Sequence, residues 1–359
     1  MIPARNALTV AALTAAALGL AIAGGSGPAA QKPATPATAT ALTGPDLLLG
    51  KAFSQPVITS DFPDPFILRT PNAYFAFSTN SGGQNAPVSR STNLVNWQFV
   101  GDALPVLAEW INTLNASIWA PESIQVKGGY AMYYSGRWSK NGLMCIGAAF
   151  ASKPEGPYFD QSSEPFICQE DQGGDIDASP FIDRDGQRYL YWKNDGNCCG
   201  MATWIWVQKL SADGRRLEGE RRQLIYNSAA WESNLIEAPN VVLRDGRYYL
   251  FYSSGRWDSP WYSVGYAVAN NPMGPFRKVT VEGALVESTD VIAGPGGQGI
   301  VTDGANKNWF YYHAWESDNT TYPAGRRAMY MTPIDWVGGR AVVGFTGARQ
   351  AAPTPLGAR

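Results

Sequence analysis

The chain has 359 residues, of which 45% are hydrophobic and 16% charged, and its formal net charge is −2. The hydrophobic share is ample for a large folded core, and neither a basic balance nor a Lys/Arg cluster is present, which argues against a nucleic-acid partner. Aromatic residues reach 12% and include 13 tryptophans. Packing between sheets and ligand binding are the two uses we expect for so many rings.

The first 23 residues differ from the rest of the chain. Arg5 precedes an apolar, Ala-rich run over 7–23, and Ala21-Ile22-Ala23 is a small-x-small cleavage site. This pattern predicts a secretory signal peptide over 1–23, and hence a secreted protein with no membrane part after cleavage. A membrane anchor is the alternative, but the run is short and interrupted by Thr and Gly. Residues 24–45 form an Ala/Pro/Thr-rich linker.

Five similar units follow, each with a proline, a polar turn and an aromatic strand. The spacing between the prolines is 56 to 59 residues, and the segments 134–138 and 253–257 are nearly identical. A long period with aromatic, alternating strands is typical of propeller blades. We therefore predict an all-β, five-bladed β-propeller over 46–348 and a tail over 349–359. The prolines are Pro65, Pro121, Pro180, Pro239 and Pro295, and the strands are expected at 74–78, 130–135, 189–192, 248–253 and 309–313.

Four cysteines in a secreted chain are candidates for disulfides. Cys145 and Cys168 flank a surface excursion of the second unit, which a bridge between them would staple. Cys198 and Cys199 are adjacent, so they form either a vicinal disulfide or two free thiols. Zinc is disfavoured by the spacings and by the presence of a single histidine, His313, which would also have to serve as the base of any Ser-His-Asp scheme.

Acidic residues stand just before the prolines of three units. In a propeller the innermost strands converge on a central channel, so Asp64, Asp177 and Glu237 are expected to meet there. Carboxylates around one pocket shift one another's pKa values, an arrangement that is costly unless it is used. Glycoside hydrolysis needs one protonated acid and one ionised carboxylate.

Four segments in order resemble the signatures of glycoside hydrolase family 43. They are 62–67, 119–122, 174–179 and 237–239, and the segments 91–97, 156–158 and 274–276 are similar to the family's blade connections. The resemblance implies an inverting enzyme that acts on arabinose- or xylose-containing polysaccharide or oligosaccharide, most simply an α-L-arabinofuranosidase or arabinanase. A β-xylosidase of the same family is the alternative, and a non-catalytic carbohydrate-binding propeller is the alternative of another class. We expect a monomer.

The resemblance also implies a role for each acid. Asp64 would be the general base, Glu237 the general acid and Asp177 the pKa modulator that orients the acid and keeps it protonated. Four neighbouring acids are weaker candidates for direct chemistry: Asp61, Glu122, Asp175 and Glu232.

His313 is either a buried structural histidine or, as the resemblance implies, a residue that coordinates a cation through water. No cofactor is expected for the chemistry, although a structural Ca²⁺ or other cation at the propeller centre fits the second reading. Many family members carry Gly-Pro-Gly-His where this chain has Gly-Pro-Gly-Gly at 294–297, so the contact supplied there is in doubt. The tryptophans best placed to stack on sugar are Trp119, Trp138, Trp192 and Trp257, with core packing as the default for half of them.

Overall fold

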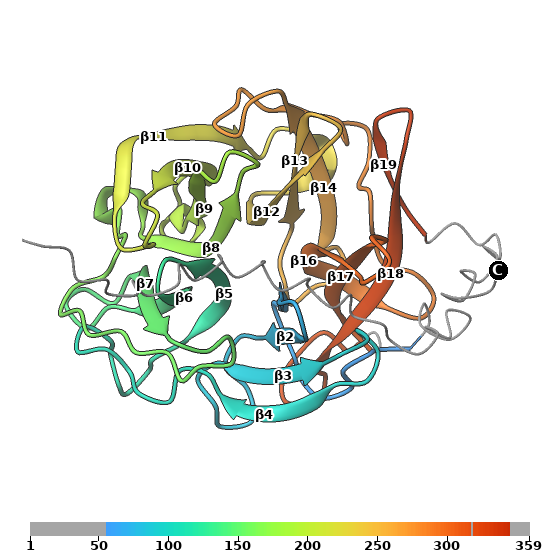
Figure 1. Cartoon of the computed structure of the whole chain (residues 1–359). Helices are drawn as coiled ribbons and strands as arrows, with labels where there is room; N and C mark the ends of the chain where they lie inside the picture. The colour runs from blue at the N-terminus through green and yellow to red at the C-terminus, as the bar shows by residue number, and fades with distance from the viewer. Residues whose placement is uncertain (1–54, 317–318, 345–359) are drawn as a thin grey trace, which may run out of the picture. The chain divides into compact units, whose positions relative to one another are not determined.

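The computed structural model describes residues 55–316 and 319–344, so the signal peptide, the linker and the C-terminal tail predicted above lie outside the described residues. The described chain folds into 19 strands and three short 3₁₀ helices, and the strands form five antiparallel sheets. Figure 1 shows these sheets arranged around a common centre. The prediction of an all-β, five-bladed β-propeller is confirmed. None of the described helices is long and apolar enough to cross a membrane.

The first strand of each sheet lies at the centre of the ring. Each inner strand contacts the inner strands of the two neighbouring blades, and the last contacts the first. The inner strands are β1 (Phe66–Arg69), β5 (Trp119–Val126), β8 (Asp175–Ile182), β12 (Ile236–Arg244) and β16 (Ala293–Thr302).

The five aromatic strands predicted from the sequence are the second strands of the blades. They are β2 (Tyr74–Phe77), β6 (Gly129–Arg137), β9 (Arg188–Asn194), β13 (Arg247–Ser254) and β17 (Asn308–Trp315). Further out lie β3 (Pro87–Ser91) and β4 (Gln98–Asp102), β7 (Met144–Ala151), β10 (Trp204–Leu210) and β11 (Leu217–Tyr226), β14 (Ser263–Ala269) and β15 (Arg277–Lys278), and β18 (Arg327–Val337) and β19 (Arg340–Val343). The helices are η1 (Glu170–Gln172), η2 (Gly196–Cys199) and η3 (Ala230–Glu232).

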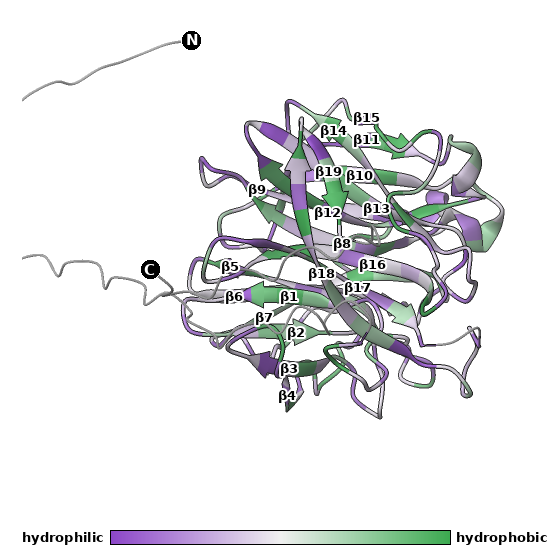
Figure 2. Cartoon of the chain, turned by 90° about the vertical axis from the view of Figure 1, so that its right-hand side faces the viewer, coloured by the Kyte–Doolittle hydropathy of each residue, from purple (hydrophilic) through white to green (hydrophobic). Residues whose placement is uncertain are grey.

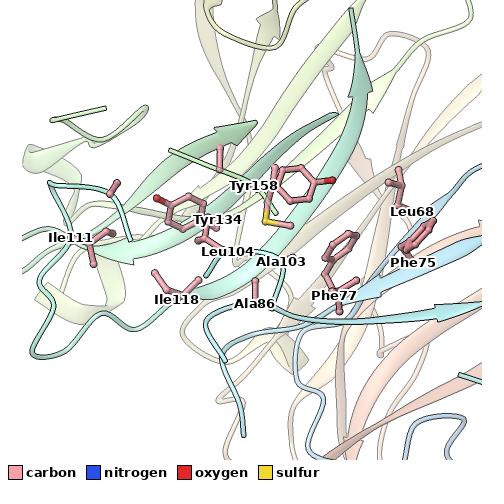
Figure 3. Close-up of a cluster of buried hydrophobic side chains, with 14 of the residues drawn as sticks. Leu68, Phe75, Phe77, Ala86, Ala103, Leu104, Ile111, Ile118, Tyr134 and Tyr158 are labelled. Carbon is pink, nitrogen blue, oxygen red and sulfur yellow. The ribbon is translucent and has the colours of Figure 1, made fainter. Parts of the chain in front are cut away.

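Blades adhere through apolar side chains on both faces of each sheet. Figure 3 shows one such cluster, in which Phe77 of blade one lies beside Tyr158, with Leu68 and Phe75 to one side of this pair and Tyr134 of blade two to the other. Each fully buried side chain of this size contributes roughly 1.5 to 3 kcal/mol. In Figure 2 hydrophobic stretches run along the stacked strands, while the loops include many hydrophilic residues. Aromatic strands suit this architecture because both of their faces are covered.

A β-bulge interrupts the inner strand of the blades at one equivalent place. In blade two the pairing steps from Trp119↔Ser135 to Glu122↔Tyr133, so three steps on β5 match two on β6. The same step occurs in blades three, four and five. At this place, and just before β1 in blade one, a residue has φ between 42° and 58°: Asp64, Ala120, Asp177, Ala238 and Gly297.

The bulges correct the repeat that the prolines suggested. Pro65, Pro121 and Pro239 directly follow a bulge residue, as a true repeat requires. Pro180 lies three residues after its bulge and Pro295 two residues before its own, so these two prolines are not equivalent to the others. The prediction was right about the number of blades and wrong about the phase of blades three and five.

The N–H groups of the bulge residues make hydrogen bonds across every blade boundary. In four of the five, the acceptor is a side chain near the end of the second strand of the preceding blade. Blade three has Lys193 at that position, which accepts no hydrogen bond, and the Asp177 carboxylate accepts instead. The bonds run from Ala120 to Thr79 Oγ1 (2.9 Å), Asp177 to Ser135 Oγ (3.1 Å), Ala238 to Asp177 Oδ2 (2.9 Å), Gly297 to Ser253 Oγ (3.0 Å) and Asp64 to His313 Nδ1 (2.9 Å).

The ring is closed by pairing between the two ends of the described chain. The N–H of Val57 donates to the carbonyl of Met329 in β18 (2.8 Å), and the Met329 N–H donates back to Ile58 (3.0 Å). Phe62 N–H also donates to the Arg327 carbonyl (2.8 Å). The segment before blade one therefore lies along the edge of blade five.

The four cysteines form two disulfides. Cys145 of β7 is joined to Cys168, and Cys198 is joined to Cys199 within η2. The structure thus resolves the alternative left open for the adjacent pair in favour of the vicinal disulfide.

The hydrogen-bond ring predicts a stability cost when one of its buried acceptors is removed. Ser135→Ala removes the acceptor of the Asp177 N–H at a fully buried site, and an unsatisfied buried donor costs about 1 to 3 kcal/mol. We expect urea unfolding to show a loss of this size, while the exposed control Ser163→Ala stays close to wild type. Equal stability of the two variants would contradict a structural role for the ring.

Candidate active site

A cavity of about 590 Å³ opens at the centre of the ring, and all five blades contribute residues to its lining. Asp64, Asp177 and Glu237 are among these residues. The structure therefore brings together the three acids that the sequence singled out. Asp64 and Asp177 are themselves bulge residues, whereas Glu237 directly precedes one.

Asp64 is held as a carboxylate by its neighbours. Thr79 Oγ1 donates to Asp64 Oδ2 at 2.6 Å, and Arg327 Nη1 lies 3.3 Å from Oδ1. Burial favours the neutral acid, but the charge of Arg327 and the Thr79 hydrogen bond outweigh it, so the pKa of Asp64 lies below its usual value. An ionised carboxylate of this kind can accept a proton from water.

Glu237 is nearly buried and both of its oxygens are occupied. Tyr262 donates its hydroxyl proton to Oε1 at 2.7 Å, and Lys193 Nζ lies 3.3 Å from Oε2. Lys193 lies in β9 of blade three and Tyr262 directly precedes β14 of blade four, so side chains from two blades hold the carboxyl group in place. Such an arrangement fixes the orientation of the acid toward the cavity.

The charges of both other acids act on Asp177. Burial and the neighbouring charge of Glu237 raise the pKa of Asp177 to about 8, and the charge of Lys193 opposes this rise. Asp177 therefore retains its proton near neutral pH, while Asp64 does not. Two carboxyl environments pushed in opposite directions are the usual mark of an acid and base pair.

His313 is fully buried, and its ring stacks on Tyr262 with centroids 5.8 Å apart. Burial and the nearby Arg327 charge lower the pKa of His313 to about 3, so the imidazole is neutral. Since Nδ1 accepts the Asp64 N–H, the ring proton must sit on Nε2, which has no hydrogen-bond partner among the described residues. His313 is thus the acceptor that closes the hydrogen-bond ring.

A cation at the centre finds little support in these side chains. Within the described ranges there is no group of three or more His, Cys, Asp or Glu residues that could hold a metal ion. A protonated Nε2 offers a metal no lone pair, so His313 does not fit the role of a direct ligand. An arrangement through water stays a prediction from the family resemblance.

Steric contacts explain why a glycine occupies position 297 at the end of the segment 294–297. A Cβ at Gly297 would approach His313 Nδ1 to 2.7 Å and the Cα of Asp64 to 3.0 Å. The positive φ of Gly297 adds to this restriction. In this chain the imidazole of His313, which arrives from the second strand, takes the space beside Asp64 that a side chain at 297 would need.

Of the four weaker acidic candidates, one lines the cavity and the other three do not. Asp61 reaches the cavity edge, where Oδ1 accepts the N–H of Arg327 at 2.9 Å. Glu122 is one layer deeper, where burial raises its pKa well above the usual value. Asp175 is buried and accepts the Gln169 N–H, and Glu232 is buried and accepts the Ala229 N–H at the start of η3. Glu122, Asp175 and Glu232 are absent from the lining of this cavity.

The four tryptophans divide evenly. Trp119 and Trp257 line the cavity, and Trp257 is 41% exposed. Trp138 and Trp192 are buried in two of the blade cores, and Trp192 stacks on Trp206. Neither buried ring has a face free for a sugar, so only Trp119 and Trp257 remain candidates for stacking.

Sequence reasoning missed Lys193, Tyr262 and Arg327, which contact the acids directly. Only Lys193 left a signal, because a lysine continues an aromatic strand at the place where two other blades carry serine. Arg327 lies above the ring of Trp257, at 4.6 Å from its centroid. Its position depends on how the last blade pairs with the first, which no local pattern shows.

The neutral state of His313 predicts a pH-dependent stability. The unfolded chain binds a proton at this residue below pH about 6.5, but the folded protein does so only near pH 3. Stability should therefore fall as pH drops from 6.5 toward 3, by up to about 1.4 kcal/mol per pH unit from this group. In His313→Gln, which cannot titrate, urea unfolding between pH 4.5 and 7.5 should show a shallower decline. Since the chain has one histidine, identical slopes would contradict the assignment.

Comparisons with known proteins agree with this geometry. The model of the family "Glycosyl hydrolases family 43" matches residues 53–340. Among curated relatives, the beta-D-galactofuranosidase of Aspergillus niger is 26% identical over 57% of this chain and 56% of its own length. A probable arabinan endo-1,5-alpha-L-arabinosidase C of the same fungus is 27% identical over 70% of this chain and 81% of its own length. This chain thus spans only about half of the first of these relatives.

A solved structure shows the same arrangement of blades. The crystal structure of a thermostable family-43 glycoside hydrolase superimposes with a TM-score of 0.74 and 28% identity, and the match covers 84% of this chain and 99% of the other. Because the family model covers most of the chain and the acids converge in one central cavity, the chain belongs to glycosyl hydrolase family 43.

Proposed function

We propose that the protein is a secreted, inverting glycoside hydrolase that cleaves α-L-arabinofuranosyl linkages in plant cell wall arabinan or arabinoxylan. The observation that carries the proposal is that Asp64, Asp177 and Glu237 converge in one cavity and that the surroundings of Asp64 and Asp177 shift their pKa values in opposite directions. The pKa of Asp64 is lowered, while that of Asp177, beside Glu237, is raised to about 8. A pure sugar-binding propeller gains nothing from this arrangement.

The proposed chemistry assigns one role to Glu237 and another to Asp64. Glu237 donates its proton to the glycosidic oxygen as the bond from that oxygen to the anomeric carbon breaks. A water on the opposite face attacks the anomeric carbon and gives its proton to Asp64. The products are a sugar with inverted configuration and a free hydroxyl on the leaving group. Proton exchange with solvent then returns Glu237 and Asp64 to their starting states.

The remaining lining supports a sugar ligand. Trp119 and the exposed part of Trp257, whose ring also contacts Arg327, offer apolar surface, while Arg327 and Asn80 offer hydrogen-bond donors to hydroxyl groups. The preference for arabinofuranosides rests on the names of the relatives, one a galactofuranosidase and one an arabinosidase. Secretion rests on the sequence of residues 1–23, and a monomeric state is part of the proposal.

The decisive experiment compares wild type with Glu237→Ala. Substrates are para-nitrophenyl α-L-arabinofuranoside, para-nitrophenyl β-D-xyloside and linear arabinan. We expect hydrolysis of the arabinoside or arabinan, with a loss of about 10²- to 10⁴-fold in the variant. The loss should be larger on arabinan, because nitrophenolate leaves without a proton. The exposed Glu282→Ala is the matched control and should keep wild-type rates.

Each alternative has its own outcome in this assay. Activity on the xyloside alone would favour a β-xylosidase. No hydrolysis of any substrate by wild type, together with retained binding of arabino-oligosaccharides, would favour a carbohydrate-binding propeller.

Inversion is tested by the stereochemistry of the first product. When wild-type enzyme acts on the α-arabinofuranoside, proton NMR within the first minutes should show the β-anomer before mutarotation. Inversion needs room for a water between base and sugar, whereas a retaining enzyme holds its two carboxyl groups closer together. Early appearance of the α-anomer would refute the assignment of Asp64 as a general base.

A further inference from the structure

Lys193 breaks the rule that the other blades follow. At the equivalent position Thr79, Ser135, Ser253 and His313 each accept the N–H of the next blade's bulge residue. A lysine ammonium has three donors and no acceptor. Blade three therefore gives up this hydrogen bond, and Asp177 takes over the Ala238 N–H. A departure from a structural rule at the wall of the cavity calls for a functional reason.

The ammonium group of Lys193 is buried and paired with carboxylates. Its side chain is 0% exposed, and Nζ lies 3.2 Å from Asp195 Oδ1 and 3.3 Å from Glu237 Oε2. Burial disfavours the charge, but Glu237, Asp195 and Asp177 more than offset it, and the pKa of Lys193 is raised. Lys193 is thus a fixed positive charge in contact with Glu237.

We propose that Lys193 is a positioning residue that holds Glu237 toward the cavity and sets the pH at which the enzyme loses the proton needed for catalysis. This inference rests on the proposed function and adds to it a residue that none of the comparisons names. Asp195 competes with Glu237 for the lysine charge, because its Oδ1 lies 3.2 Å from Nζ.

The other charged and titratable groups around Glu237 do not duplicate Lys193. Tyr262 donates to Oε1, and burial raises its pKa well above the usual value, so it stays neutral. Asp177 adds negative charge. Arg327, the second cation of the cavity lining, forms its ion pair with Asp64. Among the described residues, Lys193 is the cation that forms an ion pair with Glu237.

Removing the charge of Lys193 and removing that of Asp195 should shift the pH profile of kcat/KM in opposite directions. Without the lysine charge, the neutral, protonated forms of Glu237 and Asp177 are favoured, so the alkaline limb of kcat/KM moves to higher pH. Without the Asp195 charge, the lysine acts more strongly on Glu237, and the alkaline limb moves to lower pH. A side chain that only maintains the fold would lower the rate at all pH values and leave the limb in place.

The experiment measures kcat/KM for para-nitrophenyl α-L-arabinofuranoside from pH 4 to 10 in wild type, Lys193→Met, Lys193→Arg and Asp195→Asn. We expect an upward shift of about one pH unit or more in Lys193→Met, a downward shift in Asp195→Asn and a limb near wild type in Lys193→Arg. The exposed Lys209→Met is the matched control. A limb that stays in place in both Lys193→Met and Asp195→Asn overturns the inference.

A second measurement does not depend on activity. In urea unfolding, Lys193→Met should lose more stability at pH 8 than at pH 5, because protonated carboxyls no longer need the cation. An equal loss at both pH values overturns the inference even if the wild type hydrolyses arabinosides. An inactive wild type refutes the proposed function, and the unfolding data then decide the role of Lys193 alone. If Lys193→Met does not fold, Asp195→Asn and Lys193→Arg provide the same comparison.

Discussion

The hydrogen bond that crosses each blade boundary at the inner-strand bulge fixes the ring and the cavity together. A residue with positive φ leaves the strand ladder there, and its N–H is satisfied by the neighbouring blade. Buried backbone donors are rarely left unpaired, so each blade requires a hydrogen-bond acceptor from its neighbour. The five acceptors therefore hold the blades in register around the centre, where the acids converge.

The same bulge explains which acidic residues reach the cavity. Positive φ is unfavourable for most side chains, and Asp tolerates it better than bulky or β-branched residues. Asp64 and Asp177 occupy two of the five positions, and Ala or Gly the other three. Glu237 instead precedes a bulge and uses a longer side chain, which Tyr262 and Lys193 hold. Strain of this kind at a functional site is borne by the well-packed blades around it.

The sequence predicted correctly the features that depend on short local motifs. Aromatic second strands, the number of blades and the three acids follow from short motifs whose meaning is local. The phase of blades three and five was wrong because Pro180 and Pro295 have nearly the right spacing without sitting at the bulge. Arg327 could not be found, since its contact with Asp64 joins segments far apart in the chain. Tyr262 lies only 25 residues after Glu237, but no motif marks it. Trp138 and Trp192 show that an aromatic ring alone does not reveal whether its faces are covered.

The surroundings of Asp64 depend on the closure of the ring. Asp61 and Phe62 pair with Arg327, which lies more than 250 residues later and forms an ion pair with Asp64. Contacts between such distant segments form late, because the chain between them must first be ordered. A chain without its last blade therefore holds Asp64 without the cation that lowers its pKa. The surroundings of Asp64 are complete only when the two ends of the propeller meet.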